Sequence, residues 1–458
     1  MTKRTGKEKR SNPGRAKQKR AEPSAYADKP LLAQIEKTVE IEKPIYGGAF
    51  LARAEGKAVF VPLTLPGEQA RVRIVEDKRG YATAEVEEIV TPAPERVAPA
   101  CRHFGVCGGC HYQHAEYAAQ LRFQQAILRE TLERGGVRVP EKMAVLSADP
   151  WAYRNRIRLA FDAAGDLGYR GRRSHAVIPI AECPIAAPLL VRTAHAAGEV
   201  LRQLSFVQRA TEISFFCDAT ETALLVSVFT ARAAKGAFQD FARTLSERIP
   251  VLKGAELVAA GQPGQPPRTI AQWGATSLAY RAAGSDYRVD HGTFFQVNRW
   301  LVDALVERVT AGRSGTLAWD LFAGVGLFAR RLAEGFERVV AVESAPATAT
   351  ALEHNLSGTH ATAVKATTID FLRRAHAGER PDLIVADPPR TGLGAEACKL
   401  LGAIAAPALV YVSCDPATLA RDLRALAGAG YAIKRLALAD LFPHTFHLET
   451  VAELCRSC

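Results

Sequence analysis

After a basic N-terminal tail, residues 35–90 form short segments in which apolar and polar side chains alternate. The clearest is 69–74 (Gln-Ala-Arg-Val-Arg-Ile), and 57–61 (Lys-Ala-Val-Phe-Val) has a similar strand-like composition. Tight turns are expected where glycine or proline interrupts the segments, at Gly47-Gly48, Glu55-Gly56 and Pro66-Gly67. This pattern predicts a small β-barrel, an architecture that often presents strands and loops to single-stranded nucleic acid.

From residue 286 onward, apolar strand-like runs alternate with helical stretches. The strand candidates are 317–322, 339–343, 382–386, 408–414 and 432–438. This alternation predicts an open, doubly wound parallel sheet in a Rossmann-like α/β domain. Between the barrel and this domain, a helix over 116–133 and a mixed region over 151–281 predict a central α+β domain.

The chain is therefore expected to be multidomain, which its 458 residues also favour. The expected division is a disordered basic tail (1–30), the barrel (31–92), the central domain (93–285) and the α/β domain (286–458). The sequence contains no apolar run long enough to cross a membrane and no secretory signal, so we expect a cytoplasmic protein without a membrane partner.

The formal net charge of +11 is concentrated at the N-terminus. Residues 1–20 hold nine Lys or Arg residues against Glu8 alone, which accounts for eight of the eleven positive charges. Such a segment cannot bury enough apolar surface to fold by itself. It is either a solvated tail or an electrostatic contact for nucleic acid, and charge alone does not separate the two.

The odd number of cysteines, nine, argues against a disulfide framework and for metal binding or catalysis. Cys101, Cys107 and Cys110 lie close together in CRHFGVCGGC, and Cys183 before Pro184 is the natural fourth partner. Four thiolates suit zinc and iron–sulfur clusters equally well. Zinc with mixed ligands is also open, since histidines accompany the cysteine run at His103, His111 and His114.

A glycine-rich turn follows the first strand of the α/β domain, in Asp320-Leu-Phe-Ala-Gly-Val-Gly326. Glycines there allow a ligand to approach the backbone, and Glu343 ends the next strand, where a carboxylate can accept hydrogen bonds from ribose hydroxyls. A dinucleotide site is the rival, but the third glycine of that fingerprint is missing. Asp370 is either a helix cap or a partner for an adenine amino group.

Three further residues are candidates for the reaction itself. Asp387 begins a rigid Asp-Pro-Pro turn after an apolar strand. Cys414 ends the next strand just before a helix, whose positive end is expected to favour the thiolate, although a buried apolar cysteine is the alternative. Glu449 is an acid among apolar neighbours, which would raise its pKa and suit it to proton transfer, unless it lies on the surface. Cys217 and Cys398 are interpreted as core residues.

A nucleoside cofactor, a strand-end cysteine and a carboxylate together match the methylation of uracil at carbon 5. This carbon is a poor nucleophile until a thiolate adds to carbon 6. A base must then remove the proton from carbon 5 so that the cysteine can leave. The sequence supplies both groups.

Several motifs, in this order, make the chain resemble the bacterial RNA uracil-5-methyltransferase family. They are Phe295-Gln296-Val297-Asn298, DLFAGVG, DPPR, SCDPATLARD and FPHTFHLETV. The cysteine run with Cys183 is similar to the iron–sulfur site of the branch that acts on 23S ribosomal RNA. Residues 35–90 resemble the TRAM domain, an RNA-binding barrel.

This resemblance implies that Cys414 is the nucleophile and Glu449 the general base. It implies that S-adenosylmethionine is bound by Gln296, Phe322, Glu343, Asp370 and Asp387. It also implies a structural 4Fe–4S cluster, in place of zinc, on Cys101, Cys107, Cys110 and Cys183. The RNA partner would be 23S ribosomal RNA, and no obligate protein partner is inferred.

The sequence departs from the family pattern at a few positions. Ala323 stands where many members have cysteine, Leu327 where the ribosomal branch often has a polar residue, and Asp415 where asparagine is more usual. Asp415 is expected to raise the pKa of Cys414 slightly. Two alternatives are methylation of the transfer RNA T-loop and a non-catalytic RNA-binding assembly factor. An amino-group methyltransferase is a third, disfavoured because Arg390 replaces the usual aromatic residue.

Overall fold

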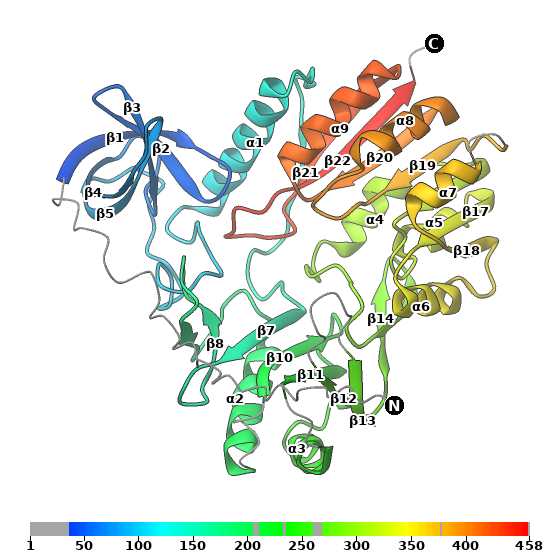
Figure 1. Ribbon diagram of the computed structural model, residues 1–458, viewed down its shortest axis with the longest axis horizontal. Helices are drawn as coiled ribbons and strands as arrows, with labels where there is room; N and C mark the ends of the chain where they lie inside the picture. The colour runs from blue at the N-terminus through cyan, green and yellow to red at the C-terminus, as the bar shows by residue number, and fades with distance from the viewer. Residues whose placement is uncertain (1–35, 205–209, 232–234, 260–267, 376–377, 457–458) are drawn as a thin grey trace, which may run out of the picture.

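The computed structural model describes residues 36–204, 210–231, 235–259, 268–375 and 378–456, so the expected tail at 1–30 lies outside it. Residues 36–91 form a closed five-stranded barrel, drawn in blue in Figure 1, with the strand order β1-β2-β3-β5-β4. Its strands are β1 (Glu36–Pro44), β2 (Ala49–Ala54), β3 (Lys57–Pro62), β4 (Gln69–Asp77) and β5 (Tyr81–Thr91). The alternating pattern places Ile41, Phe50 and Val72 inside, each at most 1% exposed, and the predicted barrel is confirmed.

A seven-stranded sheet follows in the order β13-β12-β11-β10-β7-β8-β9. Its strands are β7 (Arg156–Phe161), β8 (Leu167–Arg170), β9 (Val177–Pro179), β10 (Ala210–Cys217), β11 (Leu224–Thr230), β12 (Leu252–Ala259) and β13 (Arg268–Gly274). Helices α2 (Pro188–Gln203) and α3 (Lys235–Arg248) contribute Leu190, Leu201 and Phe238 to one apolar core with the sheet. Cys217 belongs to this core, as interpreted from the sequence.

The C-terminal sheet has eight strands in the order β18-β17-β16-β19-β20-β22-β21-β6. The strands are β6 (Ala144–Leu146), β16 (Gly315–Leu321), β17 (Phe336–Glu343), β18 (Ala361–Lys365), β19 (Leu383–Ala386), β20 (Ala408–Ser413), β21 (Tyr431–Ala439) and β22 (Glu449–Arg456). The strands from β18 to β20 are parallel to one another, as predicted. Strand β22, between β20 and β21, runs antiparallel to both.

Helices cover both faces of this sheet, which confirms the doubly wound architecture. One core contains residues of α4 (Val302–Thr310), α5 (Leu327–Leu332) and α6 (Pro346–Leu356). The other core contains residues of α1 (Tyr117–Arg134), α7 (Thr368–Ala375), α8 (Gly394–Ile404) and α9 (Pro416–Gly428). Cys398 lies in this second core, 2% exposed.

Several elements that precede residue 286 in the chain pack with the C-terminal sheet. Helix α1 contributes Ile127 and Leu132 to its second core, and β6 pairs in parallel with β21. The hairpin β14 (Ser277–Ala282) and β15 (Ser285–Asp290) contributes Tyr280 and Val289 to its first core. Figure 1 shows α1 beside α9 at the top of the molecule, away from the sheet formed by β7 to β13. In the described part of the chain, no helix combines the length and apolar character needed to span a bilayer.

Candidate active site and cysteine cavity

The turn after β16 adopts a backbone conformation that few residues tolerate. Phe322 has a φ of 63°, and Gly324 and Gly326 have φ values of 56° and 91°. The positive φ of Gly326 favours glycine, and a Cβ atom there would lie 2.8 Å from Cδ1 of Leu352, which would have to move. A strained non-glycine residue at the carboxyl end of a parallel strand is typical of a binding site.

Glu343, at the end of the neighbouring strand β17, is bonded to this turn. Its Oε2 accepts a hydrogen bond from the Gly324 N–H at 3.0 Å. Its Oε1 accepts bonds from the N–H groups of Ser344 and Ala345, both at 2.7 Å. Because each carboxylate oxygen can accept more than one hydrogen bond, the side chain is fixed and can still accept hydroxyl donors.

Asp320 lies beneath the same turn and was not selected from the sequence. Its side chain is fully buried, and Oδ2 accepts the Ala329 N–H at 2.9 Å. Oδ1 has no hydrogen-bond partner among the described residues. Burial raises the pKa of this carboxyl, and the charges of Asp387 and Glu343 raise it further. The sequence did contain a sign of this residue: Asp320 lies one position before the end of an apolar strand, and a carboxylate is rarely buried there without a partner.

Asp370 has a local structural role at the start of α7. Its carboxylate accepts a bond from the Thr367 hydroxyl at 2.7 Å, and its own N–H donates to that hydroxyl oxygen at 3.1 Å. Thr367 is therefore the N-cap of α7 and Asp370 its third helical residue, so the cap lies three positions before the residue expected from the sequence. Gln296 is 6% exposed, and its backbone carbonyl accepts a bond from the Asn155 side chain at 2.9 Å.

Cys414 and Glu449 lie opposite each other across two paired strands. In the β20–β22 ladder, Ser413 pairs with Thr450, so the residues one step beyond, Cys414 and Glu449, are neighbours at the strand ends. Asp387 follows the last residue of β19, the parallel neighbour of β20. The β-sheet topology therefore brings the three predicted reacting side chains to one edge.

The thiol of Cys414 is not activated in the free protein, contrary to the sequence-based expectation. Its pKa is raised to about 12, first by burial and then by the charges of Glu449 and Asp387, with Arg390 opposing them. The positive end of α9 interacts with Asp415 instead of with the Cys414 thiol. The Asp415 carboxylate caps the helix and accepts the N–H groups of Ala417 and Thr418 at 3.1 and 2.8 Å.

The two carboxyl groups beside Cys414 are also perturbed. Burial raises the pKa of Asp387 to about 7. Burial and the charge of Asp387 raise the pKa of Glu449 well above its usual value, while the Arg390 guanidinium opposes the change. Glu449 is only 5% exposed, so the interpretation of a surface glutamate is wrong. The Asp387 carboxyl can therefore take up and release a proton near neutral pH.

The barrel reaches this site through Tyr46, which sequence reasoning missed. Tyr46 lies in the turn between β1 and β2, and its hydroxyl donates to Oδ2 of Asp415 at 3.3 Å. Burial and the charge of Asp415 raise the pKa of Tyr46. The N–H groups of His111 and Tyr112 donate to the His444 carbonyl at 2.7 and 3.0 Å. These bonds join residues 101–112, which we call the cysteine loop, to the segment before Glu449.

The four predicted metal ligands line one cavity of about 230 Å³. Burial raises the pKa of all four thiols, and interactions among the cysteines raise it further for Cys107, Cys110 and Cys183. Three sulfur atoms have polar neighbours: the Gly109 N–H lies 3.4 Å from Cys107, the Gln113 amide 3.3 Å from Cys110 and the Tyr169 hydroxyl 3.8 Å from Cys183. The chemistry of this donor set fits a thiolate-bound cluster.

The histidines near the cysteine run either lie outside the cysteine cavity or have backbone contacts of their own. Within the described residues, no group of three or more His, Cys, Asp or Glu side chains that could hold a metal ion is found, which supports neither zinc nor an iron–sulfur cluster. His111 and His114 do not line the cysteine cavity, and His114 Nε2 lies 3.0 Å from the Thr64 carbonyl oxygen. His103 lines the cavity, but its Nε2 accepts the Ala181 N–H at 3.3 Å.

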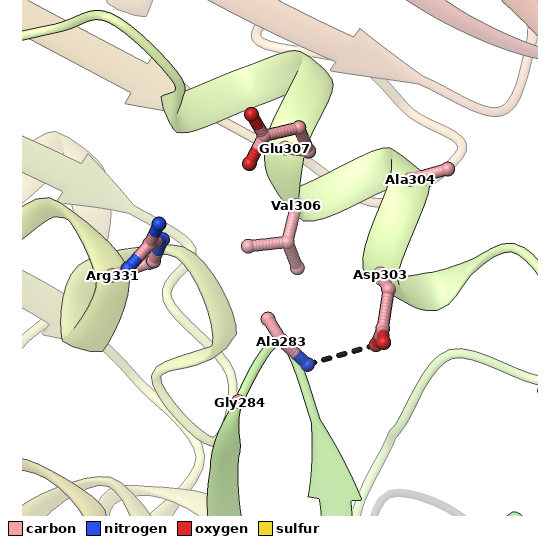
Figure 2. A pocket seen from close by; sticks show the side chains of 7 residues that line it. All are labelled: Ala283, Gly284, Asp303, Ala304, Val306, Glu307 and Arg331. Atoms are coloured by element: carbon pink, nitrogen blue, oxygen red, sulfur yellow. Dashed lines mark hydrogen bonds between the residues drawn. The ribbon is translucent and has the colours of Figure 1, made fainter.

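A separate pocket of about 530 Å³ lies between the β14–β15 turn and α4 (Figure 2). It is lined by Asp303, Glu307 and Arg331, and the Ala283 N–H donates to Asp303 at 2.8 Å. Figure 2 shows these polar side chains around Val306 on α4. None of the residues predicted for cofactor binding, catalysis or metal binding lies in this pocket.

Comparison with known families gives two matches. Residues 117–457 match the family described as tRNA (uracil-5-)-methyltransferase, and residues 36–86 match the TRAM domain. They confirm the family that the motifs indicated and the TRAM assignment of the barrel.

Individual proteins resemble the chain over most of its length. The 23S rRNA (uracil(1939)-C(5))-methyltransferase RlmD of Halomonas elongata is 33% identical, covering 89% of this chain and 86% of that protein. The protein of the same name from Klebsiella pneumoniae is 34% identical, covering 88% and 92%. The structure of Pyrococcus abyssi tRNA (uracil-54, C5)-methyltransferase with S-adenosyl-L-homocysteine has a TM-score of 0.74 and 24% identity, covering 91% of this chain and 100% of that chain. The last likeness shows the fold alone.

Proposed function

The chain belongs to the tRNA (uracil-5-)-methyltransferase family of S-adenosylmethionine-dependent RNA methyltransferases, and we propose that it methylates carbon 5 of a uridine in 23S ribosomal RNA. Relatives named for this substrate align over nearly nine-tenths of the chain. The barrel, residues 31–92, would contribute to RNA binding. Methylation of a transfer RNA T-loop is the second candidate, because the matching family model is described as tRNA (uracil-5-)-methyltransferase.

The opposed positions of Cys414 and Glu449 are the observation that carries the proposed mechanism. The Cys414 thiolate adds to carbon 6 of uracil and moves electron density to carbon 5. S-adenosylmethionine supplies the electrophilic methyl group that carbon 5 takes up. Glu449 then removes the proton from carbon 5, the bond between sulfur and carbon 6 breaks, and the ring double bond is restored. The uridine must be turned out of its loop for its ring to reach Cys414.

The residues around the glycine turn fit S-adenosylmethionine. Phe322 has a strained backbone, and a Cβ atom on Gly324 would meet nothing within 4 Å, so the turn leaves space for a ligand. Beneath it, the buried Oδ1 of Asp320 has no hydrogen-bond partner among the described residues. We assign binding of the cofactor to Gln296, Phe322, Glu343, Asp370 and Asp387. Glu343 would accept bonds from the ribose hydroxyls while its bonds to Gly324 and Ala345 hold it in place.

We also propose a 4Fe–4S cluster on Cys101, Cys107, Cys110 and Cys183. Their position around one cavity supports it, as do the polar groups beside three of the sulfur atoms. The cluster would fasten the cysteine loop to the central sheet and so shape the surface that RNA contacts. This role is structural and requires no electron transfer.

The proposal is tested with purified protein, methyl-labelled S-adenosylmethionine, and transcripts of 23S ribosomal RNA segments and of transfer RNAs. We expect 5-methyluridine in a 23S transcript with the wild type and none with Cys414→Ala. Methylation restricted to transfer RNA would show that the proposed reaction is correct and that the proposed substrate is wrong. Failure to methylate either RNA, with cofactor binding intact, would favour a non-catalytic RNA-binding factor.

A further inference from the structure

A basic cavity of about 270 Å³ lies where the barrel, the cysteine loop and the central sheet meet. We call it the arginine cavity. It is lined by Gly47 and Gly48 of the β1–β2 turn, by His111 of the cysteine loop, and by Arg170, Arg172 and Arg173 at the β8–β9 connection. Gly108 also lines it and is shared with the cysteine cavity, but the three arginines belong to none of the catalytic, cofactor or cysteine sites described above.

Within the described segments, two of the three guanidinium groups lack an acidic partner. Among the described residues, only Arg170 has a carboxylate within 4 Å, that of Glu212 at 3.3 Å. Arg172 is half-buried, and its Nη1 is buried without a hydrogen-bond partner in the described part of the chain. Burial and the charge of Arg173 lower the pKa of Arg172. A guanidinium stays charged under all ordinary conditions, so an anion that approaches a desolvated one stabilises it strongly.

The nearest opposing charge is already engaged. Glu85 on β5 attracts Arg172 at longer range, but its carboxylate is held by the Arg73 guanidinium at 2.7 Å. In the part of the chain that the structure describes, the arginine cavity therefore has an excess of positive charge, because Arg172 and Arg173 have no carboxylate within 4 Å.

Backbone contacts fix the geometry of the arginine cavity before any ligand arrives. The Arg172 N–H donates to the Val106 carbonyl at 2.9 Å, and the Gly108 N–H donates to the Arg170 carbonyl at 3.0 Å. On the barrel side, a Cβ atom on Gly48 would lie 2.6 Å from the His111 ring, so the turn packs tightly on the cysteine loop. A backbone that is already in place reduces the conformational entropy lost when a ligand binds.

The β1–β2 turn contributes residues both to the arginine cavity and to the proposed active site. Tyr46, whose hydroxyl binds Asp415 next to Cys414, directly precedes Gly47 and Gly48. An anion in the arginine cavity would therefore lie close to any RNA segment that delivers a uridine to Cys414.

We propose that the arginine cavity binds a backbone phosphate of the RNA substrate. This inference rests on the proposed function, since it takes the RNA that reaches Cys414 as the ligand. Arg172 and Arg173 donate hydrogen bonds to the phosphate oxygens, in the geometry that a planar guanidinium favours. Contacts of this kind set the register and orientation of the RNA and leave base recognition to other residues.

The test compares Arg172→Gln/Arg173→Gln with the control Arg192→Gln/Lys399→Gln, which removes the same charge from exposed positions on α2 and α8. Binding of a 23S segment is measured at several salt concentrations. We expect about a tenfold weaker affinity for the arginine variant and a salt dependence lower by about 0.7–0.9 per lost phosphate contact. The RNA KM should rise by a similar factor while kcat at saturating RNA is retained, and the control should match the wild type.

The inference is overturned if the arginine variant and the control have the same affinity and salt dependence. If the double variant is thermally destabilised, Arg173→Gln alone replaces it, because that side chain is exposed and its loss leaves the core unchanged. A wild type that binds the segment but methylates no uridine in it would refute the proposed function without deciding the binding comparison. A wild type that methylates normally, with an unaffected arginine variant, would refute the arginine cavity alone.

Discussion

Substitution of Glu449 by glutamine should stop the reaction after methyl transfer. Glutamine keeps the shape of the side chain at a position that is 5% exposed and removes its ability to accept a proton. Glu449 is also the largest charge that raises the pKa of Cys414, so its removal should lower that pKa and favour the thiolate. Addition of sulfur to uracil is therefore expected to proceed while removal of the carbon 5 proton does not.

The expected loss of turnover is large. A positioned general base typically contributes a factor of about 10²–10⁴, which corresponds to about 3–5.5 kcal/mol of barrier at about 1.4 kcal/mol for each tenfold change. The fold should tolerate the change, because the charged form of Glu449 is already disfavoured by burial. We therefore expect kcat to fall by at least about a hundredfold without a decrease in melting temperature.

The assay is a denaturing gel of Glu449→Gln incubated with labelled RNA and S-adenosylmethionine. We expect a covalent protein–RNA band that contains the transferred methyl group, and no such band for Cys414→Ala or for the double variant. Equal turnover by Glu449→Gln and wild type would refute the role of Glu449 as base. A covalent band that survives in Cys414→Ala would refute the role of the cysteine.

Three further outcomes are expected. Asp387 has a pKa of about 7 and Cys414 one of about 12, so the ionised forms of both groups increase as the pH rises. We therefore expect kcat/KM to rise when it is measured across pH 6–9. A fall above pH 7 would contradict this expectation. Tyr46→Phe removes the hydrogen bond to Asp415 and should reduce kcat by about tenfold, while the KM for S-adenosylmethionine stays unchanged. Unaltered kinetics would show that this contact does not position the nucleophile. Cys183→Ser should lower the iron content and visible absorbance of anaerobically purified protein, and an iron-free wild type would rule out the cluster.

Local pattern was sufficient to predict much of the fold. Alternation over 69–74 predicted a barrel strand, and the structure places Ala70 and Val72 inside with no exposure. The strand candidates from 317 onward correspond to β16, β17, β19, β20 and β21, because buried parallel strands consist of apolar runs with clear ends. The positions of Asp387 and Cys414 at one sheet edge follow from that topology.

Features that depend on distant parts of the chain could not be predicted in the same way. Strand β6 has three residues and pairs with a strand almost 300 positions later, too short a segment for any periodic signal. The contact between Tyr46 and Asp415 joins residues 369 positions apart. The raised pKa of Cys414 also depends on tertiary structure, since two carboxylates and burial outweigh a helix end that Asp415 already caps.

The central claim, that this protein uses Cys414 to methylate uridine in 23S ribosomal RNA, is tested most directly by nucleoside mass spectrometry. Separated 23S ribosomal RNA and transfer RNA would be compared from cells with and without the gene, and from deletion cells that express wild type or Cys414→Ala. We expect 5-methyluridine to be lost from the 23S fraction upon deletion and restored by the wild type only. Unchanged 5-methyluridine in the 23S fraction, or its restoration by Cys414→Ala, would contradict the account.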